Sequence, residues 1–216
     1  MVSKKKKSRD LYRIKKLREA ERELKNIGYS YIAGVDEVGR GPLAGPVVAC
    51  ACILPDKFSI AKINDSKKLT IEERERIYLK LIYNENVIYS VSEVSHEIID
   101  LINIHQASLL AMKKAIEALK TKHEFLLFDG RSNPVTDTPF QAIVGGDRIC
   151  ISICAASIIA EVHRDKLMDE YHKKYPIYGF DKHKGYGTLK HKKALIEHGP
   201  CLIHRKSFEP IKSLFN

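Results

Sequence analysis

The sequence lacks the long apolar runs of membrane proteins, because no stretch of 18 or more apolar residues occurs in its 216 residues. Its N-terminus is basic but has no apolar core of a signal peptide, so we expect a cytoplasmic protein. No segment is repeated, which excludes a repeat architecture. With 44% hydrophobic residues, the chain can form one domain with a core, plus a short appendage.

The cysteines also lack the spacing of a typical zinc finger. Cys50 and Cys52 are separated by one residue, and Cys150 and Cys154 by three, rather than by the usual two. Because all four lie in apolar segments, we interpret them as small buried side chains in a reducing environment. A zinc site built from these four cysteines is the alternative.

Acidic residues are outnumbered, 27 against 37 basic residues, and the net charge of +10 favours a polyanionic partner. Residues 1–25 hold eleven basic and four acidic residues, so +7 of this charge lies there. We predict a basic arm and helix over residues 1–28, ending at Gly28, and a domain over residues 29–216. If the arm contacts phosphate, deleting residues 1–25 should flatten the salt dependence of binding; a solubilising, disordered end is the alternative.

The chain is organised around residues 31–54, where an apolar strand runs into two adjacent carboxylates, Asp36 and Glu37. A loop with three glycines and two prolines follows over residues 39–46, and then a second apolar strand. Buried carboxylates are costly unless something binds them, and Mg²⁺ prefers such oxygen ligands. A β-hairpin that carries a surface Asp-Glu pair is the alternative.

Two further segments deliver an acidic residue at the end of a predicted strand. Asp129 follows the apolar run 125–128, and Asp147 follows the predicted strand 140–144 and two glycines. Ligands of open α/β sheets bind at the carboxyl ends of strands, so a carboxylate cluster that shares metal ions is expected. Adjacent strand residues point to opposite faces, so Asp36 and Glu37 can both reach such a site only if their strand bends or ends there.

The rest of the chain shows ordinary signals of helices and strands. Thr70 and Glu73 form a capping box that opens a helix, and His105 is expected to be packed rather than to bind a ligand. The predicted elements are a helix over 70–83, a strand over 87–94, one or two helices over 98–120, a long helix over 149–175 and a short helix ending at His198.

Two basic stretches could contact a polyanion. Ser66, Lys67 and Lys68 directly precede a helix N-terminus, where backbone N–H groups favour phosphate. Residues 182–188 place Tyr186 between two glycines and near lysines, so this ring could stack on a base or sugar. A solvated loop and a surface turn are the respective alternatives. Residues 204–216 show no clear chemistry of their own.

Residues 34–48 resemble the signature of bacterial ribonuclease HII. The resemblance continues in family order to the end of the chain, through residues 65–69, 129–130, 146–147, 155–160, 164–165, 184–188 and 207–208. The related ribonuclease HIII would be expected to carry a different sequence where this chain has residues 39–41. Glu161 stands where the family usually has lysine, and Val38 stands where alanine is common.

This resemblance implies an α/β ribonuclease H-like fold, with a five-stranded mixed sheet flanked by helices. It also implies hydrolysis of the RNA strand of RNA–DNA hybrids, and incision 5′ to single ribonucleotides in duplex DNA. By motif position, the catalytic carboxylates would be Asp36, Glu37, Asp129 and Asp147, binding Mg²⁺ or Mn²⁺. In the family's two-metal scheme, one ion activates water and the other stabilises the leaving 3′-oxygen, giving 3′-hydroxyl and 5′-phosphate ends.

The same resemblance implies how substrate is read. Gly39, Arg40 and Gly41 would contact the 2′-hydroxyl, largely through backbone groups, while Tyr186 would pack against the sugar of the next nucleotide. A monomer is expected by family precedent, and the sequence leaves open whether the protein binds a sliding clamp or a polymerase. A different metal nuclease, such as a resolvase or integrase, would cut all-DNA duplex equally well. An inactive nucleic-acid-binding module is disfavoured, because a phosphate binder gains nothing from a carboxylate cluster.

Overall fold

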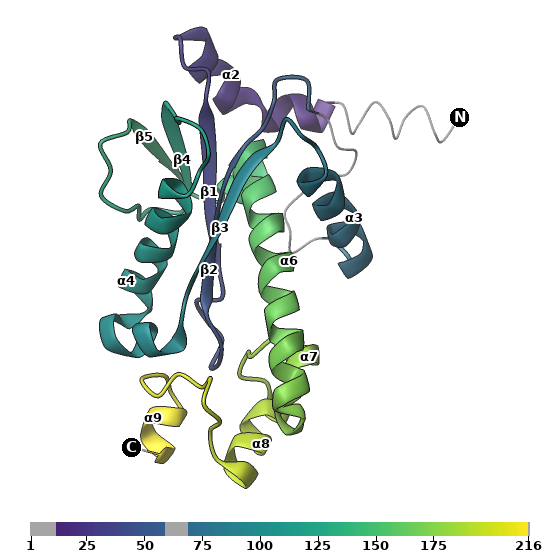
Figure 1. The fold of residues 1–216 in the computed structure, drawn as a ribbon, viewed down its shortest axis with the longest axis vertical. Coiled ribbons are helices and arrows are strands. Elements are labelled where there is room, and N and C mark those ends of the chain that lie inside the picture. The colour runs from purple at the N-terminus through teal and green to yellow at the C-terminus, as the bar shows by residue number, and fades with distance from the viewer. Residues whose placement is uncertain (1–11, 59–68, 216) are drawn as a thin grey trace.

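A five-stranded mixed sheet forms the centre of the protein, in the strand order β3-β2-β1-β4-β5 (Figure 1). This computed structural model describes residues 12–58 and 69–215. The central strand, β1, is antiparallel to β2 and parallel to β4, and β4 is parallel to β5. The strands are β1 (Ile32–Val38), β2 (Val47–Ile53), β3 (Ile88–Val94), β4 (Phe125–Asp129) and β5 (Phe140–Ile143). The predicted fold class is confirmed.

Helices cover both faces of this sheet, which explains why β1 and β2 are almost wholly buried (Figure 1). Helix α4 (His96–Glu117) packs on one face and α6 (Ile151–Lys174) on the other. The backbone of α6 approaches β1 very closely at Gly34. A Cβ atom there would lie 2.2 Å from the backbone nitrogen of Ile153, so only glycine fits.

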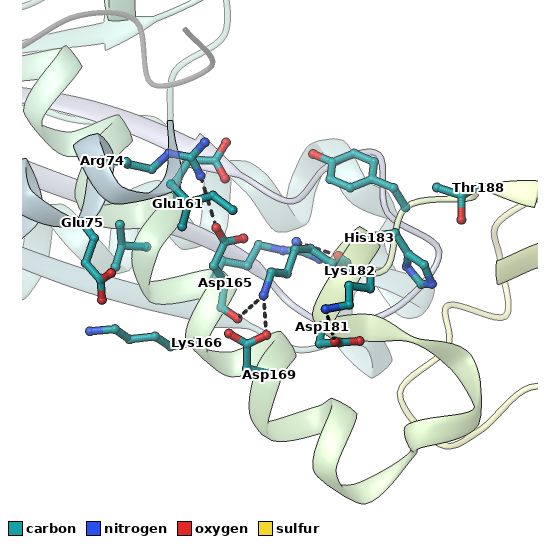
Figure 2. Close-up of a pocket in the computed structure, with 15 residues that line it drawn as sticks. Arg74, Glu75, Glu161, Asp165, Lys166, Asp169, Asp181, Lys182, His183 and Thr188 are labelled. Carbon is teal, nitrogen blue, oxygen red and sulfur yellow. Dashed lines mark hydrogen bonds and ion pairs between the residues drawn. The ribbon is translucent and has the colours of Figure 1, made fainter. Parts of the chain in front are cut away.

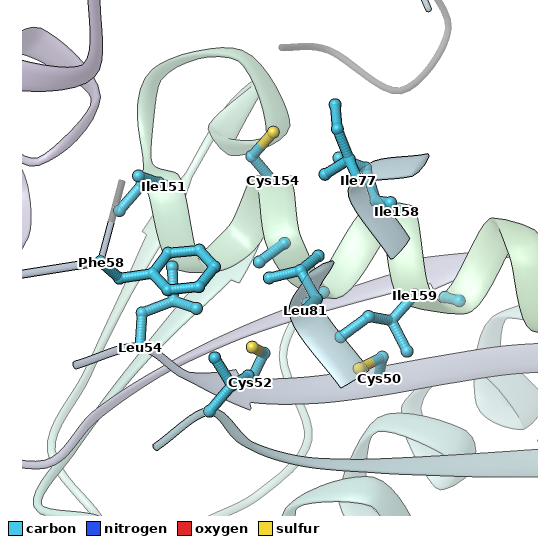
Figure 3. Packing of buried hydrophobic residues seen from close by; sticks show 14 of the residues in the cluster. Cys50, Cys52, Leu54, Phe58, Ile77, Leu81, Ile151, Cys154, Ile158 and Ile159 are labelled. Atoms are coloured by element: carbon cyan, nitrogen blue, oxygen red, sulfur yellow. The ribbon is translucent and has the colours of Figure 1, made fainter. Parts of the chain in front are cut away.

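The cysteines of β2 and α6 lie within this core, as the sequence predicted. Figure 3 shows Cys50, Cys52 and Cys154 among aliphatic side chains, including Leu81 and Ile158. These cysteines and Cys150 are buried and form no disulfide. In residues 12–58 and 69–215, no group of three or more Cys, His, Asp or Glu side chains is arranged to hold a metal ion.

Most predicted helices are present, with two breaks. The predicted helix over 149–175 is split at Cys150 into α5 (Gly146–Ile149) and α6. Helix α4 is interrupted at Asn103, whose φ is 65° and whose side chain accepts a hydrogen bond from the His105 amide at 3.0 Å. The prediction that His105 is packed is wrong, because this side chain is exposed.

The capping box of α3 (Ile71–Ile82) is confirmed. Thr70 Oγ1 accepts from the Glu73 amide at 3.2 Å, and the Glu73 carboxylate accepts from the Thr70 amide at 3.4 Å. The preceding residues Ser66, Lys67 and Lys68 lie outside the described part of the chain, so their contact with phosphate stays a prediction.

The described N-terminal residues pack on the domain. Residues 12–17 are helical, and α2 (Glu19–Asn26) follows. Ile14 and Leu17 enter the same apolar cluster as α6, and Leu24 packs against the start of β1. The predicted end at Gly28 is confirmed, because its amide and that of Tyr29 donate to carbonyl oxygens of the last turn, at 3.0 and 3.2 Å.

The C-terminal elements gather at one end of the sheet, beyond the β1–β2 connection (Figure 1). They are η2 (Pro176–Tyr178), α7 (Phe180–His183), α8 (Leu189–His198) and α9 (Ile211–Phe215). Thr188 caps the start of α8. The helix ends at His198 with Gly199 as its C-cap, as the sequence predicted. No helix in the described ranges combines the length and apolar character needed to cross a membrane.

Candidate active site

Asp36 and Glu37 lie on opposite faces of β1. The strand does not end at these residues, because pairing with β2 continues to Val38. Asp36 is 6% exposed and hydrogen-bonded by Ser157 of α6, on one face. Glu37 lines a cavity of about 240 Å³ on the other face, beneath α4. β1 therefore does not end at these carboxylates, which was one of the two conditions predicted for a shared site.

Strand β4, the parallel neighbour of β1, carries a carboxylate that lies near both Asp36 and Glu37. Pairing of β1 with β4 stops at Val35 and Phe128, so Asp129 comes directly after the last pair and lies beside Asp36. Asp129 also lines the cavity that contains Glu37. Because β4 ends here, one carboxylate at its carboxyl end can interact with carboxylates on both faces of β1.

Burial and mutual repulsion make this group of carboxylates unfavourable in its charged form. Burial, followed by the nearby charges of Glu37 and Asp129, raises the pKa of Asp36 well above its ordinary value. Burial also raises the pKa of Glu37, although Arg40 donates to this carboxylate at 3.0 Å and opposes the shift. Hard oxygen donors that repel one another fit a divalent cation, which would relieve both costs.

Asp147 is held close to Asp129 by the short helix α5. The amide of Gly146 donates to Asp129 Oδ1 at 2.7 Å, and Asp147 is the next residue, 6% exposed. A Cβ atom at Gly146 would lie 2.5 Å from Ile153 Cδ1, so this close approach needs glycine. In the described residues the carboxylates do not form a finished coordination group, and their metal-binding role stays a prediction.

Two buried arginines organise the glycine-rich loop over residues 39–46. Arg205 donates to the carbonyl oxygens of Gly39, Arg40 and Gly45, at 2.6 to 3.0 Å. Arg164 donates to the loop as well, to the carbonyl oxygens of Ala44 and Pro46, at 3.2 and 3.1 Å. The two side chains are at most 1% exposed.

Sequence reasoning missed what these arginines do. Arg164 was noted only as part of the family resemblance, and Arg205 lies in the segment without clear chemistry. No local pattern marks a guanidinium group whose partners lie more than 100 residues away. The glycines of the loop are the one signal in the sequence that points to a close approach of another side chain. Gly39 has φ +88°, and a Cβ atom there would lie 2.2 Å from Arg164 Nε.

The structure brings the glycine-rich loop and Tyr186 together. A Cβ atom at Gly41 would lie 3.6 Å from Tyr186 Cε1, and the Leu43 amide donates to the Gly185 carbonyl at 2.8 Å. Arg164 also donates to the Lys184 carbonyl at 3.0 Å, so one side chain ties the two loops together. Tyr186 is 46% exposed, so part of this residue faces solvent.

A groove of about 760 Å³ runs beside Tyr186, between α3, α6 and α7 (Figure 2). Its lining holds five basic and five acidic residues, and Glu161 is one of the latter. Arg74 pairs with Asp165 at 3.2 Å, and Lys184 pairs with Asp169. Lys184 is therefore already paired with a carboxylate, and acidic side chains interrupt the groove as a phosphate-binding surface.

Known proteins are similar to this chain in sequence and in fold. The family model for ribonuclease HII matches residues 33–211. The chain belongs to the ribonuclease HII family. The ribonuclease HII of Chlamydia caviae is 55% identical over 194 residues, which cover 90% of this chain and 91% of that protein. The prediction of this family over ribonuclease HIII is confirmed, and the chain is an enzyme of ribonuclease H type, a nuclease and hydrolase.

Solved structures of related ribonucleases have a similar fold. The ribonuclease H2 from Pyrococcus horikoshii OT3 has a TM-score of 0.71 and 25% identity, covering 85% of this chain and 96% of that chain. Bst-RNase HIII, solved in complex with Mn²⁺, has a TM-score of 0.62 and 18% identity, covering 87% of this chain and 70% of that one. The second likeness shows the shared fold of the two families.

Proposed function

We propose that this ribonuclease HII hydrolyses the RNA strand of RNA–DNA hybrids and cuts 5′ to single ribonucleotides in duplex DNA. The products would carry 3′-hydroxyl and 5′-phosphate ends. The observation that supports the specificity most directly is the close approach of Gly41 to Tyr186, whose ring would touch a Cβ atom at this glycine. It places a glycine-rich backbone and an exposed aromatic ring side by side, next to the carboxylates of β1.

The glycine-rich loop would read the 2′-hydroxyl group that separates RNA from DNA. Arg205 already occupies the carbonyl oxygens of Gly39 and Arg40, so the amide groups of residues 39–41 are the candidates for this contact. Tyr186 would pack on the sugar of the following nucleotide, where a deoxyribose fits. The hydrogen bonds of Arg164 and Arg205 to this loop would help to hold both groups in place for such a contact.

Asp36, Glu37, Asp129 and Asp147 would hold Mg²⁺ or Mn²⁺. When bound, such ions activate the attacking water and stabilise the leaving 3′-oxygen. The protein's own groups orient the ligands: Ser157 donates to Asp36, Arg40 to Glu37 and the Gly146 amide to Asp129. The solved Mn²⁺ complex of Bst-RNase HIII supports a divalent ion in this fold.

The remaining contacts are with the phosphate backbone. Ser66, Lys67, Lys68 and the basic residues 1–11 would supply them, because the groove beside Tyr186 is balanced in charge. Glu161 lies in this groove, so the departure from the usual family lysine would weaken phosphate contact on this side.

The test is cleavage of a labelled DNA duplex with one ribonucleotide, in Mg²⁺ or Mn²⁺, beside all-DNA and RNA–DNA hybrid controls. We expect one cut 5′ to the ribonucleotide, none in all-DNA, and no cut by Asp36→Asn. Equal cutting of all-DNA duplex would overturn the proposal in favour of a different metal nuclease. Activity on RNA–DNA hybrids alone would argue against recognition of the ribonucleotide junction by residues 39–41 and Tyr186.

A further inference from the structure

Two fully buried histidines lie directly behind Tyr186. His191 of α8 is 0% exposed and His204 is 1% exposed. The rings of Tyr178 and Phe180 enclose them in the C-terminal apolar cluster, and the His183 ring stacks on His191 with centroids 4.5 Å apart. Neither histidine belongs to the proposed metal site, and uncompensated polar groups in such a cluster would be costly.

The shortest hydrogen bonds of the two rings favour one arrangement of protons over one in which His204 Nδ1 donates to the Cys201 carbonyl oxygen, 3.3 Å away. His191 Nδ1 lies 2.9 Å from the Tyr186 carbonyl oxygen, which can only accept, so Nδ1 carries the proton and Nε2 does not. His204 Nε2 lies 3.0 Å from this Nε2 and must donate to it. His204 Nδ1 is then an acceptor, and the Cys201 amide donates to it at 2.9 Å.

The result is a directed relay of three hydrogen bonds, from the Cys201 amide through His204 and His191 to the carbonyl of Tyr186. In this arrangement both rings are neutral, because a second proton on either would place two N–H groups against each other. Burial lowers the pKa of His191 and of His204 to about 4, which keeps the relay intact at neutral pH.

The relay fixes the backbone of Tyr186 together with two local bonds. The Tyr186 amide donates to the His183 carbonyl at 2.8 Å, and the Thr188 amide donates to the Tyr186 carbonyl, also at 2.8 Å. Backbone groups are thus held on both sides of the residue, while its ring stays half-exposed beside Gly41. The histidines behind Tyr186 therefore help to hold the backbone from which that ring projects.

We infer that His191 and His204 are positioning residues for substrate specificity, which hold Tyr186 against the sugar that follows the ribonucleotide. This inference rests on the proposed function of Tyr186. Loss of the relay should lower the preference for a ribonucleotide–deoxyribonucleotide junction and leave hydrolysis of long RNA–DNA hybrids in place, because the carboxylates lie elsewhere.

A matched pair of variants at His191 separates this role from packing. The amide nitrogen of asparagine falls near the Nδ1 position, so His191→Asn can still donate to Tyr186. The amide of glutamine falls near the Nε2 position, so His191→Gln can still meet His204 but loses Tyr186. The two side chains are similar in polarity, and both replace the ring.

The measurement is the ratio of kcat/KM on a duplex with one ribonucleotide to kcat/KM on a long hybrid. We expect His191→Gln to lower this ratio about tenfold, as the loss of one well-formed hydrogen bond would do. His191→Asn should stay close to wild type, as should His198→Gln, an exposed histidine of the same helix. An unchanged ratio in His191→Gln, or an equal loss on both substrates, would overturn the inference.

Variants at His204 keep the test decisive if the first pair folds poorly, as judged by thermal melting. His204→Gln retains a donor toward His191, whereas His204→Asn loses it, so the second variant alone should lower the ratio. Tyr186→Ala serves as the reference. If it leaves the ratio unchanged, both the proposed function of Tyr186 and this inference fail; if it lowers the ratio and His191→Gln does not, the inference fails alone.

Discussion

Arg205 donates a hydrogen bond to the carbonyl oxygen of Gly39 at 2.6 Å, although 166 positions separate the two residues in the chain. The same guanidinium group reaches Arg40 and Gly45 and lies over the ring of Phe208, 5.0 Å from its centroid. The five donors of a planar, fork-shaped guanidinium group are spread over three nitrogens and reach carbonyl groups on both ends of this loop, whereas the three donors of a lysine ammonium all lie on one atom. The C-terminal segment thereby determines the shape of the glycine-rich loop.

We predict that Arg205→Lys destabilises the protein and impairs cleavage of both substrates. Leaving one or two buried carbonyl groups unsatisfied costs about 1–3 kcal/mol in the free energy of unfolding. Urea denaturation and kcat/KM on the single-ribonucleotide duplex measure the two effects. Arg22→Lys, at an exposed position of α2, is the control. Wild-type stability and activity in Arg205→Lys would show that the loop holds its shape without the fork.

Glu21 is predicted to stabilise α6 from outside that helix. Its carboxylate is 5% exposed and accepts from the Ser152 amide at 2.9 Å, in the first turn of α6. Glu21→Ala should lower the free energy of unfolding by about 1–2 kcal/mol, the usual cost of a lost cap. Glu23→Ala, an exposed neighbour, should have little effect. Equal effects of the two substitutions on urea denaturation would contradict this role.

The burial of Glu21 also changes how the basic arm should be tested. Deleting residues 1–25 would remove this carboxylate together with the buried side chains of Ile14, Leu17 and Leu24. Deleting residues 1–11 instead removes five basic residues and one acidic residue. The slope of log K against log salt for duplex binding should then become less steep. An unchanged slope would argue against phosphate contact by the arm.

Acid should destabilise the protein through the buried histidines. Their pKa is lowered from 6.5 to about 4, so the unfolded chain binds more protons between these two values. Stability present above pH 6.5 is therefore lost as pH falls toward 4, by about 2 kcal/mol for each histidine between pH 7 and 5. Urea denaturation of wild type and His191→Gln should differ by about this amount in their acid-induced loss. An identical loss would contradict the neutral state of His191.

Replacing a buried carboxylate of the site should lower the activity and raise the thermal stability of the protein. Asp36→Asn removes the cost of burying a charge beside Glu37 and Asp129, and should raise the melting temperature in EDTA. Added Mg²⁺ should raise the melting temperature of wild type more than that of the variant, because the ion binds the folded carboxylates. Asp137→Asn, at an exposed position, is the control. Equal shifts by Mg²⁺ in all three proteins would argue against a metal site at Asp36.

Local signals in the sequence determined the secondary structure. The apolar runs of β1, β2 and β4, the capping box at Thr70 and the turn at Gly28 depend on neighbouring residues, and all were predicted. Motif position identified Asp36, Glu37, Asp129 and Asp147 as candidates, and the cost of burying charges at the ends of strands pointed to a ligand at the same place.

Only the tertiary structure decided how these residues are held. It placed Asp36 and Glu37 on opposite faces of β1, with Asp129 next to both, because β4 ends where β1 continues. Contacts between distant segments are a property of packing and leave no periodicity to read in a sequence. For this reason the arginine fork on Gly39, the carboxylate of Glu21 on α6 and the histidine relay behind Tyr186 became visible only when the chain was folded.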